Sequence, residues 1–188
     1  CGKRYNNFRQ FLESNDSSQP FCFWFGSHDP HRSFKKGAGV EAGIAPPKIK
    51  IPKCFPDSTE VRNDIADYYS EVQRFDNEVG ELIKLLEKKG LLENTIVVMT
   101  SDHGMPFPRC KGNLYDQGTR VPLAIRWGKK LTSQVKGGVE SEMVNLIDLA
   151  PTILEVAGVE KPSSMLGDSL LSESRKKRDF TIFCKERH

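Results

Sequence analysis

An acidic and an imidazole side chain stand next to each other at Asp102 and His103, directly after the apolar run Ile96 to Thr100. That run has the length and the β-branched content of a buried strand, and it ends at this pair and Gly104. Open α/β sheets bind ligands at the carboxyl ends of their strands. Lys111 follows His103 by eight residues, in a loop rich in Pro and Gly. The pattern therefore predicts that the positively charged Lys111 side chain is held near the Asp–His pair.

A second polar cluster, His28-Asp29-Pro30-His31-Arg32, follows the apolar run Phe21 to Gly26. The run is of strand length and would be buried on both faces in the middle of a sheet. Either cluster alone is common in turns, but separated polar groups that converge on one sheet edge are what a metal and oxyanion site requires. Together the two clusters predict a hydrolase-like α/β domain that could hold a metal.

The remaining patterns predict the elements that position these groups. A helix is expected to begin with Asp57 as its N-cap, because apolar residues recur at steps of three and four as far as Leu86, and Gly90 suits its C-terminal cap. Before it, Gly37 to Pro56 lacks periodicity and predicts a long surface loop that could wall a cleft. Further elements are expected as helices at Tyr5–Leu12 and Asp148–Gly158, and as strands at Val121–Trp127 and Phe180–Cys184.

The composition narrows the class of protein. The chain has 188 residues, the size of one domain, and a formal net charge of +3. The balanced charge gives no case for nucleic-acid binding, and the basic run Arg175 to Arg178 is interpreted as a solvated segment. No apolar run approaches the roughly 20 residues of a membrane span. Five cysteines without a CxxC pair predict neither a disulfide framework nor a structural zinc site, and they leave the redox compartment open.

Six segments resemble the sulfatase family of the alkaline-phosphatase superfamily, and they occur in the family's order. These segments are Phe25–Arg32, Arg62–Gly80, Asn94–Gly104, Gly118–Leu123, Asp148–Gly158 and Met165–Leu171. Within the family, the sequences HDPHR at 28–32 and PFPRCKGNLY at 106–115 are most similar to the heparan N-sulfatase (sulfamidase) branch, whose members are N-sulfoglucosamine sulfohydrolase-like. The resemblance covers nearly the whole chain.

The resemblance implies an α/β fold of the alkaline-phosphatase type. This fold is a three-layer sandwich with a mixed, mostly parallel central sheet flanked by helices, and it would be incomplete at both ends of this chain. Residues 1–162 would form part of the catalytic α/β domain. Residues 163–188 would begin a smaller C-terminal subdomain.

The resemblance also implies roles for individual residues. Sulfatases hold a divalent ion, usually Ca²⁺, with two N-terminal aspartates, a formylglycine, and an Asp–Asn or Asp–His pair that Asp102 and His103 match. Lys111 matches the basic residue that contacts the sulfate, where it would offset charge developing on the oxygens. His31 resembles the histidine near the leaving-group oxygen, and His28 is the competing candidate. An imidazole at His103 leaves Mn²⁺ or Zn²⁺ open as alternatives to Ca²⁺.

The family's nucleophile motif and its two N-terminal aspartates are missing from the chain. The segment Cys54 to Ser58 offers Cys, Pro and Ser, but no Ser-Arg follows the proline. It also lies downstream of the histidine cluster, whereas the family's nucleophile lies upstream. The chain begins at Cys1 rather than Met. We therefore expect a longer parent protein that carries the formylglycine before Cys1, and no turnover by residues 1–188 alone.

The parent protein is expected to hydrolyse a sulfate ester or a sulfamate on a sugar or glycosaminoglycan, in a periplasmic, extracellular or lysosomal compartment. Its partner would be a sulfated small molecule or glycan, and Asp29 and Arg32 would anchor a loop rather than meet a substrate carboxylate. One alternative is a phosphonate or phosphate ester hydrolase of the same superfamily. The other is a non-catalytic protein that binds acidic glycans through Lys111, Arg109 and the basic run.

Overall fold

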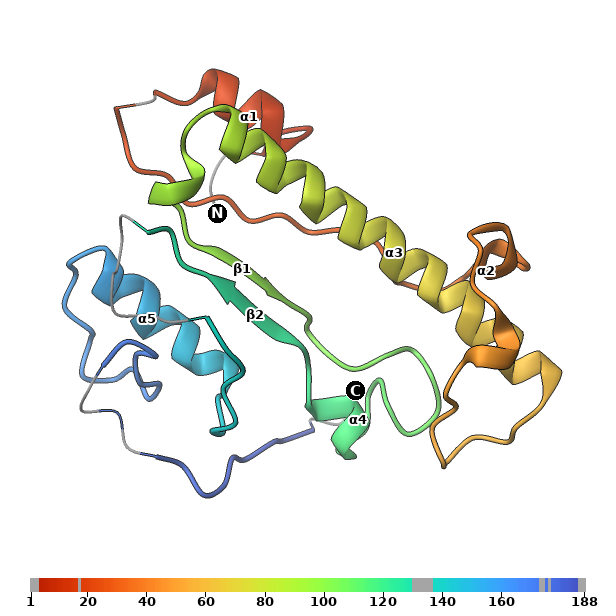
Figure 1. The fold of residues 1–188 in the computed structure, drawn as a ribbon. Helices are drawn as coiled ribbons and strands as arrows, with labels where there is room; N and C mark the ends of the chain where they lie inside the picture. The colour runs from red at the N-terminus through yellow and green to blue at the C-terminus, as the bar shows by residue number, and fades with distance from the viewer. Residues whose placement is uncertain (1–3, 17, 130–136, 173–174, 176, 186–188) are drawn as a thin grey trace. The chain divides into compact units, whose positions relative to one another are not determined.

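The computed structural model describes residues 4–16, 18–129, 137–172, 175 and 177–185 (Figure 1). The first residue of the chain, Cys1, and Lys176 of the basic run both lie outside these residues. The chain divides into two compact units, residues 1–92 and residues 93–188. The helices and strands of the described part are α1 (Phe8–Ser14), α2 (Ala38–Glu41), η1 (Pro46–Lys48), α3 (Thr59–Lys88), η2 (Leu92–Asn94), β1 (Val97–Thr100), α4 (Asp116–Thr119), β2 (Leu123–Arg126), η3 (Leu146–Asp148) and α5 (Leu149–Val156). Every helix among them is too short or too polar to cross a lipid bilayer.

In the first unit, helix α1 packs its aromatic residues against the segment that follows it. Phe8 and Phe11 are buried, and the centroid of each ring lies 4.8 Å from that of Phe23. Asn7 caps the helix by accepting a hydrogen bond from the Gln10 amide at 2.9 Å. The prediction of a helix in this region is therefore confirmed, with later bounds than expected.

The prediction of a strand at residues 21–26 is wrong. The segment pairs with no strand in the described residues, and Trp24 is 90 % exposed. An apolar run becomes a strand only where a neighbouring strand accepts and donates backbone hydrogen bonds. Here the contacts of Phe21 and Phe23 with α1 hold the segment instead.

Helix α3 confirms the predicted periodicity but not the predicted N-cap. The cap is Ser58, whose hydroxyl accepts a hydrogen bond from the Val61 amide at 3.4 Å. Asp57 pairs instead with Arg62, whose Nε lies 2.7 Å from the carboxylate. Because the guanidinium competes for this carboxylate, the helix begins one residue later than the Asp57 cap predicts. At the other end, Gly90 has φ 68°, the left-handed conformation expected of a C-terminal cap.

The predicted loop from Gly37 to Pro56 contains two short helices, α2 and η1, so a loop without regular structure is a wrong prediction. Helix α2 packs beside the N-terminal part of α3 (Figure 1). The buried carboxylate of Asp67 in α3 accepts hydrogen bonds from the Gly37 and Gly39 amides at 3.0 and 2.8 Å. A Cβ atom on Gly39 would lie 2.3 Å from the Ala66 carbonyl carbon, so only glycine allows this approach. One carboxylate thus fixes α2 to α3.

The second unit contains the one sheet of the described residues, the antiparallel pair β1 and β2. Val97 pairs with Arg126, and Thr100 pairs with Leu123. Both strands were predicted from β-branched and apolar runs, and both are confirmed within slightly shorter bounds. This pair is antiparallel, whereas the sheet was expected to be mostly parallel. The three-layer sandwich stays a prediction.

Helix α5 confirms the helix predicted at residues 148–158 and depends on Asp148, which precedes it. The Asp148 side chain is fully buried and accepts hydrogen bonds from the Asn145 and Asp168 amides at 2.9 and 3.0 Å. It also forms a two-point ion pair with Arg178, so the interpretation of the basic run as a solvated segment is wrong for Arg178, whose side chain is 20 % exposed. Burial by itself raises the pKa of Asp148, but the hydrogen bonds from Arg178 and the two amides outweigh burial and hold this pKa below its usual range. The charged carboxylate therefore fastens residues 168 and 178 to the start of α5.

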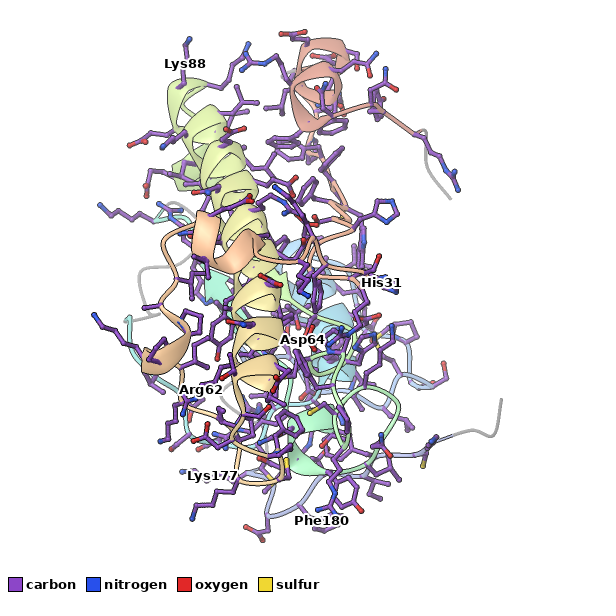
Figure 2. All side chains as sticks on the ribbon, turned by 90° about the vertical axis from the view of Figure 1, so that its right-hand side faces the viewer. His31, Arg62, Asp64, Lys88, Lys177 and Phe180 are labelled. Carbon is purple, nitrogen blue, oxygen red and sulfur yellow. The ribbon has the colours of Figure 1, made fainter. Side chains whose placement is uncertain are left out.

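The predicted strand at residues 180–184 is also wrong, because the segment pairs with no strand in the described part of the chain. Phe180, which Figure 2 labels, is 71 % exposed, as is Ile182. Apolar sequence alone cannot make a strand without a partner for its backbone.

Replacement of Arg178 by Ala is expected to lower the free energy of unfolding of the second unit by about 3 kcal/mol, because a buried carboxylate loses its cation. The neighbouring Lys177 pairs with Glu142 at the surface, so Lys177→Ala is the matched control and should cost less than about 1 kcal/mol. Urea unfolding followed by tryptophan fluorescence measures both in a Trp24→Phe background, where Trp127 is the remaining tryptophan. Equal losses in the two variants would contradict the assigned role of Asp148.

Candidate active site

The turn after β1 carries Asp102 and His103 and is fixed by its own backbone. The Ser101 hydroxyl donates to the His103 carbonyl at 3.0 Å, and the Gly104 amide donates to the Gly118 carbonyl at 3.1 Å. A Cβ atom on Gly104 would lie 1.8 Å from the Gln117 carbonyl oxygen, so glycine is required there. These contacts restrain the backbone that carries the Asp–His pair.

Asp102 and His103 present two donor atoms to the same space. His103 Nδ1 lies 2.7 Å from the Gly104 carbonyl oxygen, which can only accept a hydrogen bond, so Nδ1 carries the proton. The lone pair of the ring is therefore on Nε2, which lies 3.6 Å from the Asp102 carboxylate. Ligands of one divalent ion lie about 2.0–2.6 Å from it, so an oxygen and a nitrogen at this separation can share an ion.

This pair fits a metal ion but would supply only two ligands. The described residues contain no group of three or more His, Cys, Asp and Glu side chains arranged to hold a metal. The Asp102 side chain is 86 % exposed and the His103 side chain 34 %, so both are open to further ligands. Ca²⁺ takes six to eight oxygen ligands, and a nitrogen ligand also suits Mn²⁺ or Zn²⁺.

Lys111 belongs to a loop that is cross-linked by hydrogen bonds. The Lys111 amide donates to the Met105 carbonyl at 3.1 Å, and its carbonyl accepts from the Asn113 side chain at 3.1 Å. The side chain of Lys111 is exposed. The hydrogen bonds of the loop therefore fix the backbone of Lys111, while its charged side chain lies at the surface.

In the first unit, the histidine cluster is fastened to α3 by ion pairs. Arg74 donates to both oxygens of Asp29 at 2.9 Å and also pairs with the buried Glu71. Arg32 forms a two-point pair with Asp64, and its guanidinium lies 4.5 Å from the centroid of the Phe34 ring. Asp29 and Arg32 thus have the anchoring contacts expected of them.

His28 and His31 are both exposed and lie on the turn that these ion pairs hold. The His31 amide donates to the His28 carbonyl at 2.9 Å. His31 Nδ1 contacts the Arg32 carbonyl oxygen, which can only accept a hydrogen bond, so Nδ1 carries a proton. Arg32, the next residue after His31, pairs with Asp64 of α3, and Figure 2 labels His31 and Asp64.

The groups around Asp29 and Glu71 shift the pKa values of these two carboxyl groups in opposite directions. Burial raises the pKa of Asp29, but hydrogen bonds from Arg74 and Glu71 and the positive charges of Arg74 and His28 lower it below its usual range. Burial and the neighbouring Asp29 carboxylate raise the pKa of Glu71, although Arg74 opposes the rise. Stability from Asp29 is present above the ordinary carboxyl pKa and is lost as pH falls through its lower value. Stability from protonated Glu71 is present in acid and is lost as pH rises through its higher value.

The sequence pattern does not identify Arg74, Glu71 and Asp64 as part of the cluster. All three lie on α3, and their partners Asp29 and Arg32 lie more than 30 residues earlier in the chain. The only signal within the helix is the spacing of Glu71 and Arg74 by three residues, which places the two charges on one face. That spacing does not identify a partner outside the helix.

The second unit of this α/β chain contains the candidate metal-binding pair Asp102 and His103, and the first unit contains the polar cluster His28–Arg32. A family model for sulfatases matches residues 3–159. The chain belongs to the sulfatase family, as the six segments predict.

The names of the similar proteins refer to different substrates. The chain is 32 % identical over 183 residues to human N-sulphoglucosamine sulphohydrolase, covering 82 % of this chain and 34 % of that protein. It is 35 % identical over 130 residues to an ulvan-active sulfatase of Formosa agariphila, covering 69 % and 21 %. A solved phosphonate monoester hydrolase from Silicibacter pomeroyi is 26 % identical with a TM-score of 0.51, covering 75 % of this chain and 30 % of that one, which supports the α/β class. The chain thus spans about a third or less of the length of these relatives.

Asp29→Asn is expected to lower the pKa of Glu71, because it removes the carboxylate that disfavours a second negative charge. Arg74→Gln is expected to raise the same pKa, because it removes the neighbouring cation. Carbon-13 NMR titration of the Glu71 carboxyl group measures both shifts. An unchanged Glu71 pKa in either variant would contradict the network.

Proposed function

We propose that the protein containing this chain hydrolyses a sulfate ester or sulfamate on a sugar or glycosaminoglycan. The observation that carries the proposal is the fixed Asp102–His103 pair at the end of β1, in a chain of the sulfatase family. The name of the human relative, N-sulphoglucosamine sulphohydrolase, supports a sulfated sugar as substrate. Family membership also supports an exported compartment, periplasmic, extracellular or lysosomal.

Asp102 Oδ and His103 Nε2 are proposed to hold one side of a divalent ion, Ca²⁺ or alternatively Mn²⁺ or Zn²⁺. When bound, such an ion polarises sulfate oxygens and favours a deprotonated nucleophile. The nucleophile is proposed to be a formylglycine in the parent protein, outside residues 1–188. The hydrogen bond from His103 Nδ1 to the Gly104 carbonyl places the lone pair of the neutral ring on Nε2 and orients the ring for the metal.

Lys111 is proposed to contact the oxygens of the scissile sulfate. Negative charge on these oxygens is offset by a cation whose backbone is already fixed, so little reorganisation is needed during the reaction. His31 is proposed to donate the proton that the leaving oxygen or nitrogen requires when its bond to sulfur breaks. The contact of His31 Nδ1 with the Arg32 carbonyl orients the ring, which supports His31 over His28, and the donated proton would be carried on Nε2 of the imidazolium.

The proposed architecture is the alkaline-phosphatase-like sandwich with a mixed, mostly parallel sheet. Residues 1–162 would contribute to its catalytic domain and residues 163–188 to a smaller C-terminal subdomain. The alternative activity, hydrolysis of phosphonate or phosphate esters, is favoured by the similarity to the phosphonate monoester hydrolase. Rates of the full-length protein on matched sulfate and phosphate esters of one sugar distinguish the two.

Lys111→Ala in the full-length protein is expected to lower kcat for a sulfated glucosamine by about 100- to 1000-fold, as does the loss of one donor to a transition-state oxyanion. Lys84, an exposed lysine of α3, provides the control Lys84→Ala, which should leave kcat unchanged. Steady-state release of sulfate measures both. A Lys111→Ala variant with normal kcat would exclude the role of Lys111. Lost affinity without any turnover in the wild type would favour the non-catalytic binding alternative.

His103→Asn is expected to shift metal preference of the full-length protein toward Ca²⁺, because it replaces an imidazole nitrogen by an amide oxygen. Competitive loading with Ca²⁺, Mn²⁺ and Zn²⁺, followed by elemental analysis, measures the preference without reference to activity. The same metal content in variant and wild type would show that His103 is not a ligand.

A further inference from the structure

Arg109, two residues before Lys111, has an unusual backbone conformation. Its φ is 62°, and it is the one residue other than glycine with positive φ in the described part of the chain. This left-handed conformation costs a side chain with a Cβ atom of order 1 kcal/mol or more and persists where the surroundings impose it. Such positions are enriched at ligand-binding sites.

The surroundings that impose it are centred on Cys110. Cys110 is fully buried, with its sulfur 3.4 Å from the Pro108 carbonyl and from the Gln117 side-chain oxygen. The Cys110 amide donates to the Phe107 carbonyl at 3.1 Å, and a Cβ atom on Gly118 would lie 2.4 Å from the Cys110 carbonyl oxygen. Because Cys110 packs inward against these groups, the residues on either side of it, Arg109 and Lys111, are both exposed.

The exposed guanidinium of Arg109 is held on an aromatic ring. It lies 5.4 Å from the centroid of the Tyr115 ring, within the range of a cation–π contact. Among the described residues Arg109 has no ion pair with a carboxylate. A planar guanidinium binds the two oxygens of a sulfate or carboxylate at once, and an aromatic support reduces the freedom lost on binding. The group is thus prepared for an anion that the described chain does not supply.

We infer that Arg109 recognises a second anionic group of the substrate, a sulfate or a carboxylate, while Lys111 contacts the sulfate that is removed. This inference rests on the proposed function. The Cα atoms of the two residues lie within about 7 Å of each other, because they are separated by one residue. Two cations this close favour ligands with two negative groups over ligands with one. Arg109 therefore selects multiply charged sugars.

The test compares three sugars in the full-length protein: N-sulfoglucosamine, its 6-O-sulfated form, and N-sulfoglucosamine linked to a uronic acid. Arg109→Ala is expected to lower kcat/KM about 10- to 100-fold for a sugar with a second anionic group, mainly through KM, and less than about threefold for N-sulfoglucosamine. Arg109→Lys, which keeps the charge but not the planar pair of donors, should fall between. A larger loss on the 6-O-sulfated sugar assigns the second group as sulfate, and a larger loss on the uronic acid conjugate assigns it as carboxylate.

Arg9→Ala is the matched control, because Arg9 is an exposed arginine of α1 and its loss changes the net charge equally. It should leave all three values unchanged. An equal loss on all three sugars in Arg109→Ala, or equal losses in the two variants, would overturn the inference. If the wild type hydrolyses none of them, the proposed function fails, and calorimetric affinities for the same sugars decide on Arg109. A preference of the wild type for doubly charged sugars that Arg109→Ala removes supports the inference, and its absence refutes it.

Discussion

The ion pair between Arg74 and Asp29 is the interaction on which the placement of the histidine cluster depends. The segment before the cluster has no strand partner among the described residues, so regular backbone hydrogen bonds do not fix it. A two-point pair at 2.9 Å to a rigid helix provides that restraint. Glu71 accepts a further hydrogen bond from the same guanidinium and is itself buried, which limits how Arg74 can move. The position of the imidazoles is therefore set by a helix that carries neither of them.

The same physical arrangement recurs at Asp67 and Asp148. Asp67 lies in α3 and accepts hydrogen bonds from the amides of Gly37 and Gly39 at the start of α2. Asp148 precedes α5 and accepts hydrogen bonds from the amides of Asn145 and Asp168, so both are buried carboxylates that join separate segments. A carboxylate removed from water must be compensated, and the amides of loops need acceptors, so one group satisfies both requirements. Asp148 has an additional partner in Arg178, which accounts for its lowered pKa despite burial. Loops fixed in this way tolerate little change in the anchoring residue, although none of these carboxylates touches a substrate in the proposed mechanism.

The sequence predicts those parts of the fold that depend on local pattern. Apolar residues at steps of three and four identify α3, and β-branched runs identify β1 and β2. It fails where a distant partner decides the outcome. Asp57 has the chemistry of an N-cap, but Arg62 competes for it and Ser58 takes the role. Residues 21–26 have the composition of a strand but lack one to pair with in the described chain.

Some residues of the candidate site can likewise be predicted from the sequence, and others cannot. Asp102, His103 and Lys111 could be found from residue type and position after a predicted strand, and the structure adds the tautomer of His103. Arg74 could not be found, because nothing in a helical pattern reveals an ion pair formed across 45 residues. Arg109 could be found only in part: its charge is visible in the sequence, but its left-handed backbone and its support on Tyr115 follow from the packing of Cys110.

Cys110 links the chemistry of this loop to its packing. Cys110 is buried, whereas its neighbours Arg109 and Lys111 are exposed, so the packing of Cys110 fixes the backbone from which both cationic side chains extend. Since that backbone is also fixed by hydrogen bonds, an anion that bound there would cost little free energy in ordering the loop. Under the inference above, residues 109–111 would distinguish ligands by charge more than by shape.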